Sequence, residues 1–369
     1  MMVVGFANLM TFIVNFEIGS IAFTLMVTVV GMQFGIFTDA FFEQVSTLDF
    51  HYIQLDIFNL ITGLYAVAAV LISFGGVIGK VTPFQLLIMA ILELIFYSLN
   101  NEVFMVTVFD IADIGGTIII HEFGAFFGLA VAFTYGLPNV EDKVLQGRLS
   151  DVFSLMGTVF LWVYWPSFVG GECVAGSDEQ QRAMVNTIIA LVSSSTVAFA
   201  ASCLLSSDYK LRCADIQNAT LAGGVAIGAI ADLTLAPATV SLVGMTAGLV
   251  SVVGFKFIQP FLETRVGLHD TCGIHNLHGM PSLVGGFASV IVAYYKGAVV
   301  GTDSSVYGEG DRSNQWEMQL AGVFVTLIVA VSSGAITGLL MKSLDFTEYE
   351  QFKDCMWIDE PEEEHEHKQ

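Results

Sequence analysis

The chain has 369 residues, of which 54% are hydrophobic and only 13% charged, and its mean hydropathy is +0.71. A soluble domain carries roughly 25% charged residues, so the composition excludes an ordinary soluble protein. Glycine lets membrane helices approach closely, and the 36 glycines therefore indicate a polytopic helical membrane protein. The formal charge of −22 at pH 7 argues against a nucleic-acid partner.

Apolar segments of helix length recur along the whole chain. A bilayer core requires about 20 residues per span, and the first segment is short by that measure. We therefore predict an all-α membrane protein with about eleven transmembrane helices. They lie near residues 1–15, 19–41, 55–79, 84–106, 113–134, 151–171, 182–205, 215–235, 238–258, 271–294 and 319–342.

The Lys and Arg residues between these segments predict the orientation. If the N-terminus is outside, the outer loops contain Arg182, Lys296 and Arg312. The inner loops and tail then contain Lys80, Lys143, Arg148, Lys210, Arg212, Lys256, Arg265, Lys342, Lys353 and Lys368. This positive-inside bias predicts a cytoplasmic C-terminus, and we expect the plasma membrane as the location.

Two predicted helices each begin with an Asp that is followed eight positions later by a His. These pairs are Asp113–His121 and Asp270–His278. Eight helical residues rise about 12 Å, which puts each His near the middle of a membrane core about 30 Å thick. The fifth span runs inward and the tenth outward, so the chain divides into two inverted five-helix repeats followed by one C-terminal helix. The two histidines should therefore meet at the centre.

Buried ionisable groups in membrane spans are costly and commonly mark a transport path. Facing imidazoles offer both a hydrogen-bond donor and an acceptor to a small polar molecule. A structural role remains the alternative for His121 or His278 taken alone. Asp113 and Asp270 can act as helix N-caps, as anions at the two pore approaches, or as both.

Aromatic and acidic residues inside the spans give further candidates. Phe168 ends the stretch Trp-Val-Tyr-Trp-Pro-Ser-Phe, and Tyr65 lies in the third span. They belong either to an interfacial aromatic belt or to a gate that excludes water and attracts cations. Glu93 and Glu122 are expected to be hydrogen-bonded partners between helices.

A metal site is a further alternative, because His269, Cys272, His275 and His278 lie within ten residues. Structural zinc sites need about four well-placed ligands, often in paired spacings. No second cluster supports this one, and we expect neither a cofactor nor an enzymatic activity. An intramembrane metalloenzyme that uses these residues is kept as the alternative.

The end of the chain differs from the rest, because residues 348–366 are rich in acids and poor in apolar residues. We predict a transmembrane domain over residues 1–346 and an acidic cytoplasmic tail over residues 347–369. Such a composition is typical of a solvated, disordered extension.

Four motifs resemble those of the Rhesus (Rh) glycoproteins, a family of the ammonium transporter superfamily. They span Gly115–Gly128, Phe160–Phe168, Asp215–Gly224 and His269–Pro281. The resemblance runs from about Asn8 to Lys342. It implies a homotrimer embedded in the lipid bilayer, with a hydrophobic path for ammonia through each subunit. Rh glycoproteins usually have an additional N-terminal span and a glycosylated outer loop, which suggests either an incomplete sequence or a short form.

The resemblance also implies roles for single residues. It places the twin pore histidines at His121 and His278, the pore aspartates at Asp113 and Asp270, the inner aromatic gate at Phe168, the outer gate at Tyr65 and an acidic outer-vestibule residue at Glu102.

Together these features predict an ammonia channel that recruits ammonium, removes its proton and passes neutral ammonia. The alternatives are an electrogenic ammonium transporter with a histidine proton relay and a non-transporting Rh-like scaffold protein. Conduction of carbon dioxide is an additional expectation to test.

Overall fold

The structure is a computed structural model that describes all residues except 1, 54, 138–146, 297–311, 345–352 and 360–369. All regular secondary structure in these residues is helical. Nine of the described helices are long and apolar enough to cross a membrane. Two shorter helical stretches, Met2–Phe12 and residues 213–230, occupy the first and eighth predicted spans. The predicted all-α fold with about eleven spans is therefore confirmed.

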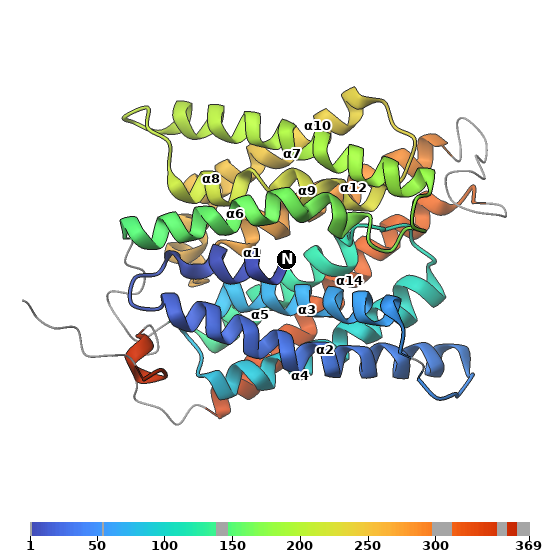
Figure 1. The fold of residues 1–369 in the computed structure, drawn as a ribbon, viewed down its shortest axis with the longest axis horizontal. Helices are drawn as coiled ribbons and strands as arrows, with labels where there is room; N and C mark the ends of the chain where they lie inside the picture. Colours follow the sequence, from blue (N-terminus) through green and yellow to red (C-terminus); the bar gives the residue numbers. More distant parts are fainter. Residues whose placement is uncertain (1, 54, 138–146, 297–311, 345–352, 360–369) are drawn as a thin grey trace, which may run out of the picture.

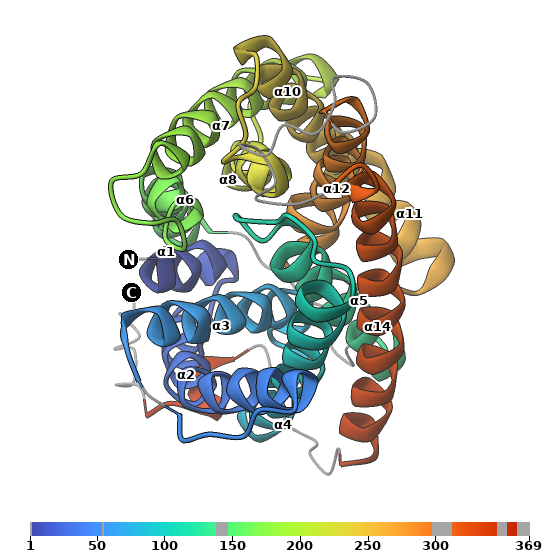
Figure 2. The same cartoon turned by 90° about the vertical axis from the view of Figure 1, so that its right-hand side faces the viewer.

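The helices run roughly parallel to the long axis of the molecule (Figure 1). The view along this axis shows the first half of the chain on one side of the bundle and the second half on the other (Figure 2). The first half contains α1 (Met2–Leu9), α2 (Glu17–Thr47), α3 (Ile57–Val77), α4 (Pro83–Ser98) and α5 (Phe123–Tyr135).

The second half contains α6 (Arg148–Val169), α7 (Asp178–Leu205), α8 (Cys213–Ala219), α9 (Ala222–Ile227), α10 (Pro237–Val253), α11 (Gln259–Phe261) and α12 (Met280–Tyr294). The long helix α14 (Gln315–Ser343) packs against α4, α5 and α12 and thereby joins the two halves (Figure 2).

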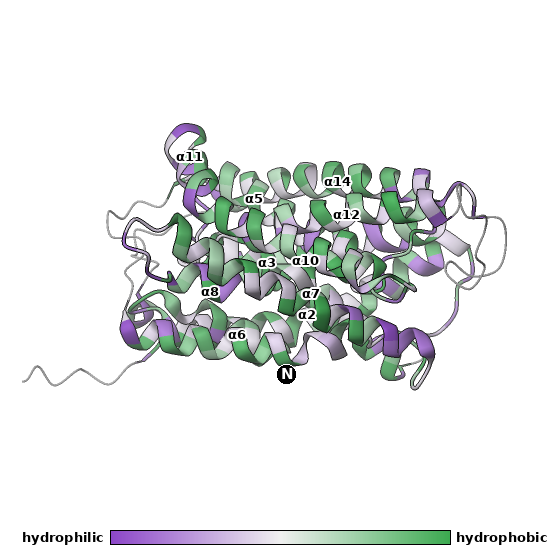
Figure 3. Cartoon of the chain, turned by 90° about the horizontal axis from the view of Figure 1, so that it is seen from above, coloured by the Kyte–Doolittle hydropathy of each residue, from purple (hydrophilic) through white to green (hydrophobic). Residues whose placement is uncertain are grey.

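Hydrophobic residues dominate the middle of the bundle, whereas hydrophilic residues gather at its two ends (Figure 3). This distribution fits a protein whose middle lies in the hydrocarbon core of a bilayer. One end contains Asp113 and is called the Asp113 end below. The opposite end contains Asp270 and is called the Asp270 end.

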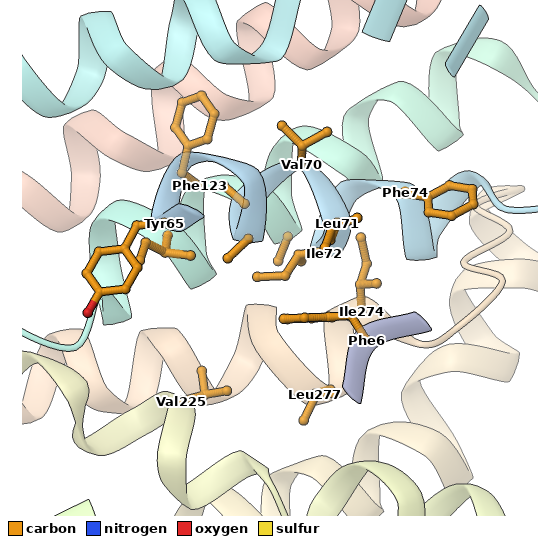
Figure 4. Close-up of a cluster of buried hydrophobic side chains, with 14 of the residues drawn as sticks. Phe6, Tyr65, Val70, Leu71, Ile72, Phe74, Phe123, Val225, Ile274 and Leu277 are labelled. Carbon is orange, nitrogen blue, oxygen red and sulfur yellow. The ribbon is translucent and has the colours of Figure 1, made fainter. Parts of the chain in front are cut away.

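Helix α3 lies inside the bundle, where an all-round apolar helix is expected. Its side chains from Ala66 to Ile72 are nearly or completely buried. Tyr65 lies towards one end of the buried stretch and Phe74 towards the other, with Ile274 on a neighbouring segment (Figure 4).

The described part of the acidic tail packs against the bundle, so the prediction of a solvated extension is wrong there. Asp354 is buried, and its carboxylate accepts hydrogen bonds from the backbone N–H groups of Ile18, at 2.8 Å, and Gly19, at 2.7 Å. Phe16 precedes α2 and supplies no side-chain cap. A distant Asp therefore caps α2, because the first N–H groups of a helix lack partners within it.

Candidate functional site

Each histidine lies just after a helix start that an aspartate caps. The Oδ2 atom of Asp113 accepts hydrogen bonds from the N–H groups of Ile118 and Ile119, both at 2.8 Å. The Asp270 carboxylate accepts three, from Gly273 and Ile274 at 3.0 Å and from His275 at 2.9 Å. Both aspartates therefore cap helix starts, as one of the two interpretations of the sequence predicts, although each lies upstream of the N-cap position, which Gly116 and Ile274 occupy.

The two starts share the same backbone design. Gly116 and Gly273 each follow the capping Asp by three positions and have φ angles of +67° and +73°. A side chain would be strained in this left-handed conformation. A short π-helix follows each glycine, over Thr117–Glu122 and His275–Gly279. Such wide turns are frequent at functional sites. The inverted halves thus present His121 and His278 in equivalent ways.

The structure brings the two histidines together. The Nδ1 atom of His121 lies 3.2 Å from the Nδ1 atom of His278, which is hydrogen-bonding distance. Their rings are nearly parallel, with a 17° interplanar angle and centroids 5.1 Å apart. Both side chains are buried, and Nε2 of His121 has no hydrogen-bond partner among the described residues. Since two Nδ1 atoms share one hydrogen bond, one ring donates and the other accepts.

Trp165 on α6 covers the other face of His121 and was not among the sequence candidates. Its ring stacks on the imidazole, with centroids 5.5 Å apart and an interplanar angle of 23°. The side chain is fully buried, and its indole N–H lacks a partner among the described residues. In the sequence, only the position of Trp165 three residues before Phe168 in the aromatic stretch could have indicated that it packs against His121.

Tyr65 and Phe168, the two predicted gate residues, contact each other and form one aromatic pair. Their ring centroids are 4.7 Å apart at an interplanar angle of 64°. The Tyr65 hydroxyl also donates a 2.5 Å hydrogen bond to the backbone oxygen of Phe168. Phe168 in turn lies 6.3 Å from His121, centroid to centroid. The aromatic pair therefore separates the histidines from the Asp113 end.

A cavity of about 550 Å³, called the outer cavity below, opens at the Asp113 end beside Tyr65. Four carboxylates line it, from Glu102, Asp113, Glu172 and Asp232. The Oδ1 atom of Asp113 has no hydrogen-bond partner among the described residues, so this residue caps a helix with one oxygen only. Asp232 lies in the connection between Ile230, where the eighth helical stretch ends in the structure, and α10, and burial raises its pKa to about 6. The cavity is thus suited to a small cation.

A second cavity, of about 540 Å³, lies at the Asp270 end and is called the inner cavity below. His278, Asp270 and His269 line it together with apolar side chains such as Leu71. The amine of Lys80, a buried residue that the sequence analysis did not single out as a site residue, donates a 2.6 Å hydrogen bond to the backbone oxygen of His269. Lys80 therefore ties the end of α3 to the loop that carries Asp270.

The two acids inside the spans differ in their surroundings. Glu93 accepts a 2.5 Å hydrogen bond from the Ser73 hydroxyl and so links α4 to α3, as predicted. Glu122 has no hydrogen-bond partner for either carboxylate oxygen among the described residues, so its predicted inter-helix bond is wrong. Gly286 allows close packing beside Glu122, because a Cβ atom there would lie only 2.7 Å from Cγ2 of Val323 and 3.9 Å from Oε2 of Glu122.

The clustered residues His269, Cys272, His275 and His278 do not converge on a metal. Within the part of the chain that the structure describes, no three His, Cys, Asp or Glu side chains are grouped to hold an ion. His278 faces His121 instead, and the ring of His275 contacts Phe126 edge-on, with centroids 6.4 Å apart. These residues are close in sequence, but His275 and His278 point to different partners from one helix start, so their spacing does not create a metal site.

Known proteins share this architecture. The family model described as Ammonium Transporter Family matches residues 1–363. The chain is 40% identical over 354 residues to ammonium transporter Rh type B of Rattus norvegicus and 37% identical over 354 residues to Rh type C of Bos taurus. Each alignment covers 93% of this chain and 76% of the relative.

Solved structures show the same similarity. The Rh50 protein of Nitrosomonas europaea is 31% identical and superposes with a TM-score of 0.83, over 99% of this chain and 91% of that one. A sensor Amt protein superposes with a TM-score of 0.75 over 95% of this chain and 93% of that one. At 19% identity, this second similarity concerns the fold alone.

Proposed function

The chain belongs to the ammonium transporter family, and on that premise we propose that it is a Rh-type channel for ammonia. The observation that carries the proposal is the buried contact between His121 and His278. It lies between an acidic cavity and a second cavity at the opposite end. We further propose that the Asp113 end faces outward and the Asp270 end faces the cytoplasm, in keeping with the Lys and Arg distribution.

Ammonium is recruited at the outer cavity. The carboxylates of Glu102, Asp113, Glu172 and Asp232 attract the cation and raise its local concentration. Beyond this point the path is dry, and a bare ion there costs far more than a neutral amine. The cation therefore loses one N–H proton. That proton returns to outer water by way of the free Oδ1 atom of Asp113.

Neutral ammonia then passes the aromatic pair. Tyr65 and Phe168 pack edge to face and are joined by a hydrogen bond, so they must separate transiently to admit a molecule. Closed rings exclude water from the histidines beyond them. This exclusion favours the neutral species over the hydrated cation.

The histidine pair gives ammonia complementary partners. The ring that donates through Nδ1–H keeps a lone pair on Nε2, whereas the accepting ring carries its hydrogen on Nε2. The pair therefore offers one acceptor and one donor to a molecule that can both donate and accept. Hydrogen bonds to His121 and His278 offset part of the cost of dehydrating ammonia. At the inner cavity ammonia takes up a proton from water near Asp270 and leaves as ammonium.

The rival mechanisms use the same residues differently. In electrogenic transport the hydrogen bond between His121 and His278 would carry the proton across, and net charge would move. An apolar path also admits carbon dioxide, a neutral gas. A non-transporting scaffold would conduct nothing. We propose a homotrimer in the plasma membrane without enzymatic activity, as the resemblance to Rh glycoproteins implies.

The deciding experiment uses proteoliposomes that contain the full chain. Internal pH and electrical current are recorded together after an inward ammonium gradient is applied. Fast internal alkalinisation without current supports conduction of neutral ammonia. Current in proportion to uptake contradicts it and indicates electrogenic transport, and the absence of both signals indicates a scaffold. A parallel bicarbonate gradient, read as internal acidification, tests carbon dioxide.

A further inference from the structure

A second cavity at the Asp113 end, called the side chamber below, has no role in the path described so far. Its volume is about 550 Å³, and it lies between the second half of α2 and the start of α3. The chamber is lined by four carboxylates, from Asp39, Glu43, Asp56 and Glu102. Glu102 and Thr62 line both the side chamber and the outer cavity, so the two spaces adjoin.

Asp39 is the residue that points to a ligand. It lies within a membrane-spanning helix, is only 6% exposed, and lines the chamber. Neither carboxylate oxygen has a hydrogen-bond partner among the described residues. The nearby Ser98 hydroxyl donates to Thr38 instead, at 2.8 Å. Leaving a buried carboxylate without a partner is costly, so a ligand that compensates its charge is expected in the space it faces.

The other carboxylates increase the negative charge around Asp39. Glu43 lies one turn further along α2, which places both acids on the same face of the helix. Glu102 accepts a 2.8 Å hydrogen bond from the Asn101 amide, and Asp56 caps α3 through the N–H groups of Phe58 and Asn59. Asp39 and Glu43 are thus the acids with the most capacity left for a ligand.

The geometry favours a monovalent cation over a divalent metal. Divalent ions such as Ca²⁺ require six to eight oxygen ligands that converge closely. The described acids are not grouped in that way, since no three of them can hold one metal ion. A water molecule occupies about 30 Å³ of liquid, so the chamber has room for a cation that keeps much of its hydration shell.

We propose that the side chamber is a second cation site, in which Asp39 and Glu43 bind ammonium, or an ion of similar size and charge, next to the outer cavity. The chamber stores substrate where Glu102 can pass it to the transport path. The assignment to ammonium rests on the proposed function, whereas the binding of a monovalent cation does not.

The first test therefore measures binding without transport. Crystals of the full chain are soaked in thallium(I), a heavy ion with the charge and approximate size of ammonium, and anomalous density is recorded. We expect a peak beside the Asp39 carboxylate in the wild type. We expect its loss in the double variant Asp39→Asn, Glu43→Gln. No peak in the wild type, or a peak that persists in the double variant, would overturn the proposal.

The second test measures ammonium uptake by proteoliposomes at low external concentrations. Asp39→Asn should raise the half-saturating ammonium concentration about three- to tenfold, the size expected for loss of a local electrostatic attraction. Asn has the same shape as Asp, and no hydrogen bond of Asp39 is lost, so the variant should fold. The matched control is Asp49→Asn at the same end, since Asp49 does not line the chamber. Equal shifts in both variants would contradict a specific site.

The two tests separate this proposal from the proposed function. If the wild type conducts no ammonia, the channel proposal fails while the thallium peak still decides the cation site. If ammonia is conducted but the thallium peak is absent, the channel proposal stands and the side chamber is not a cation site.

Discussion

The Tyr65 hydroxyl is hydrogen-bonded to the backbone oxygen of Phe168 at 2.5 Å, while the two rings pack with centroids 4.7 Å apart. The same pair of residues is therefore held by a polar and an apolar contact. A phenylalanine at position 65 would keep the ring contact and lose the hydrogen bond. The phenol thus makes separation of the rings more difficult than ring packing alone would.

We predict that Tyr65→Phe increases the rate of ammonia conduction. One hydrogen bond contributes about 0.5–1.5 kcal/mol, so ring separation should become roughly two- to tenfold more frequent. Stopped-flow alkalinisation of proteoliposomes measures this change. Tyr164→Phe is the control, because Tyr164 lies on the same helix as Phe168 and its ring stacks on Phe160 instead. An unchanged or lower rate in Tyr65→Phe would show that ring separation does not limit conduction.

The second prediction concerns the histidine pair. His121→Ala or His278→Ala removes one of the two imidazoles proposed to bind ammonia. The Nδ1 atom of the other histidine then lacks its hydrogen bond. Each lost hydrogen bond costs about 0.5–1.5 kcal/mol, so ammonia flux should fall roughly two- to tenfold. His275→Ala is the control, because His275 lies one turn earlier and outside the pair. Normal ammonia and methylammonium flux in both variants would remove the histidines from the mechanism.

Much of this site could be predicted because its signals are local in the sequence. The eight-residue spacing from Asp113 to His121 and from Asp270 to His278 predicts the depth of each histidine along its helix, and the Lys and Arg residues predict the direction of each span. Two antiparallel helices of equal design then bring their histidines to the same level. The structure adds the 3.2 Å contact, which depends on ring orientation and not on spacing.

The contacts that hold the loops could not be predicted, because each joins residues far apart in the chain. Lys80 bonds to the backbone of His269, 189 positions later. Asp354 caps α2 at Gly19, 335 positions earlier. Composition marks the segment around Asp354 as a solvated tail, and only the missing cap of α2 explains why it is bound. The pattern of residues in a single sequence does not show which distant residues are in contact.

A third distant contact leads to a prediction about Gln319 on α14. Its buried amide accepts a 2.8 Å hydrogen bond from the N–H of Ala112 and donates a 2.9 Å bond to the carbonyl of the same residue. Ala112 directly precedes Asp113, so Gln319 is a positioning residue for the loop that carries this aspartate.

Gln319→Met should displace that loop, because two backbone groups lose their partners. We expect a loss of stability of about 1–3 kcal/mol, together with a higher half-saturating ammonium concentration. Thermal unfolding and concentration-dependent uptake measure the two effects. Gln33→Met is the control, since the exposed Gln33 side chain donates its hydrogen bond within its own helix, to the backbone oxygen of Val29. A loss of stability with an unchanged half-saturating concentration would limit Gln319 to a structural role.

The fourth prediction tests the tail. Asp354→Ala removes the carboxylate that caps α2 at Ile18 and Gly19. Loss of a helix cap costs about 0.5–2 kcal/mol, and the melting temperature should fall accordingly. Asp359→Ala is the control, because Asp359 is an exposed acid of the same segment. Equal melting temperatures for both variants would mean that the tail contact adds nothing to stability.

The last prediction concerns pH at the Asp113 end, where Asp232 lines the outer cavity. Burial raises the pKa of its carboxyl group to about 6, so the group is negative above that pH and neutral below it. Ammonium remains protonated throughout this range, so the attraction for it should weaken as the external pH falls through about 6. The half-saturating ammonium concentration of the wild type should then rise.

Asp232→Asn is neutral at every pH and should remove the part of this step that occurs near pH 6, with a higher half-saturating concentration above that pH. The step that remains should lie nearer pH 7, because burial raises the pKa of Glu172, in the same cavity, to about 7. Asp178→Asn is the control, because Asp178 begins α7 at the same end and does not line the cavity. Uptake measured in proteoliposomes between external pH 5 and 8, at fixed internal pH, provides the comparison. If Asp232→Asn retains the step near pH 6, a group other than Asp232 controls recruitment in that range. If the half-saturating ammonium concentration of the wild type falls below pH 6, the pH dependence is opposite to the one expected for a carboxylate that becomes neutral there.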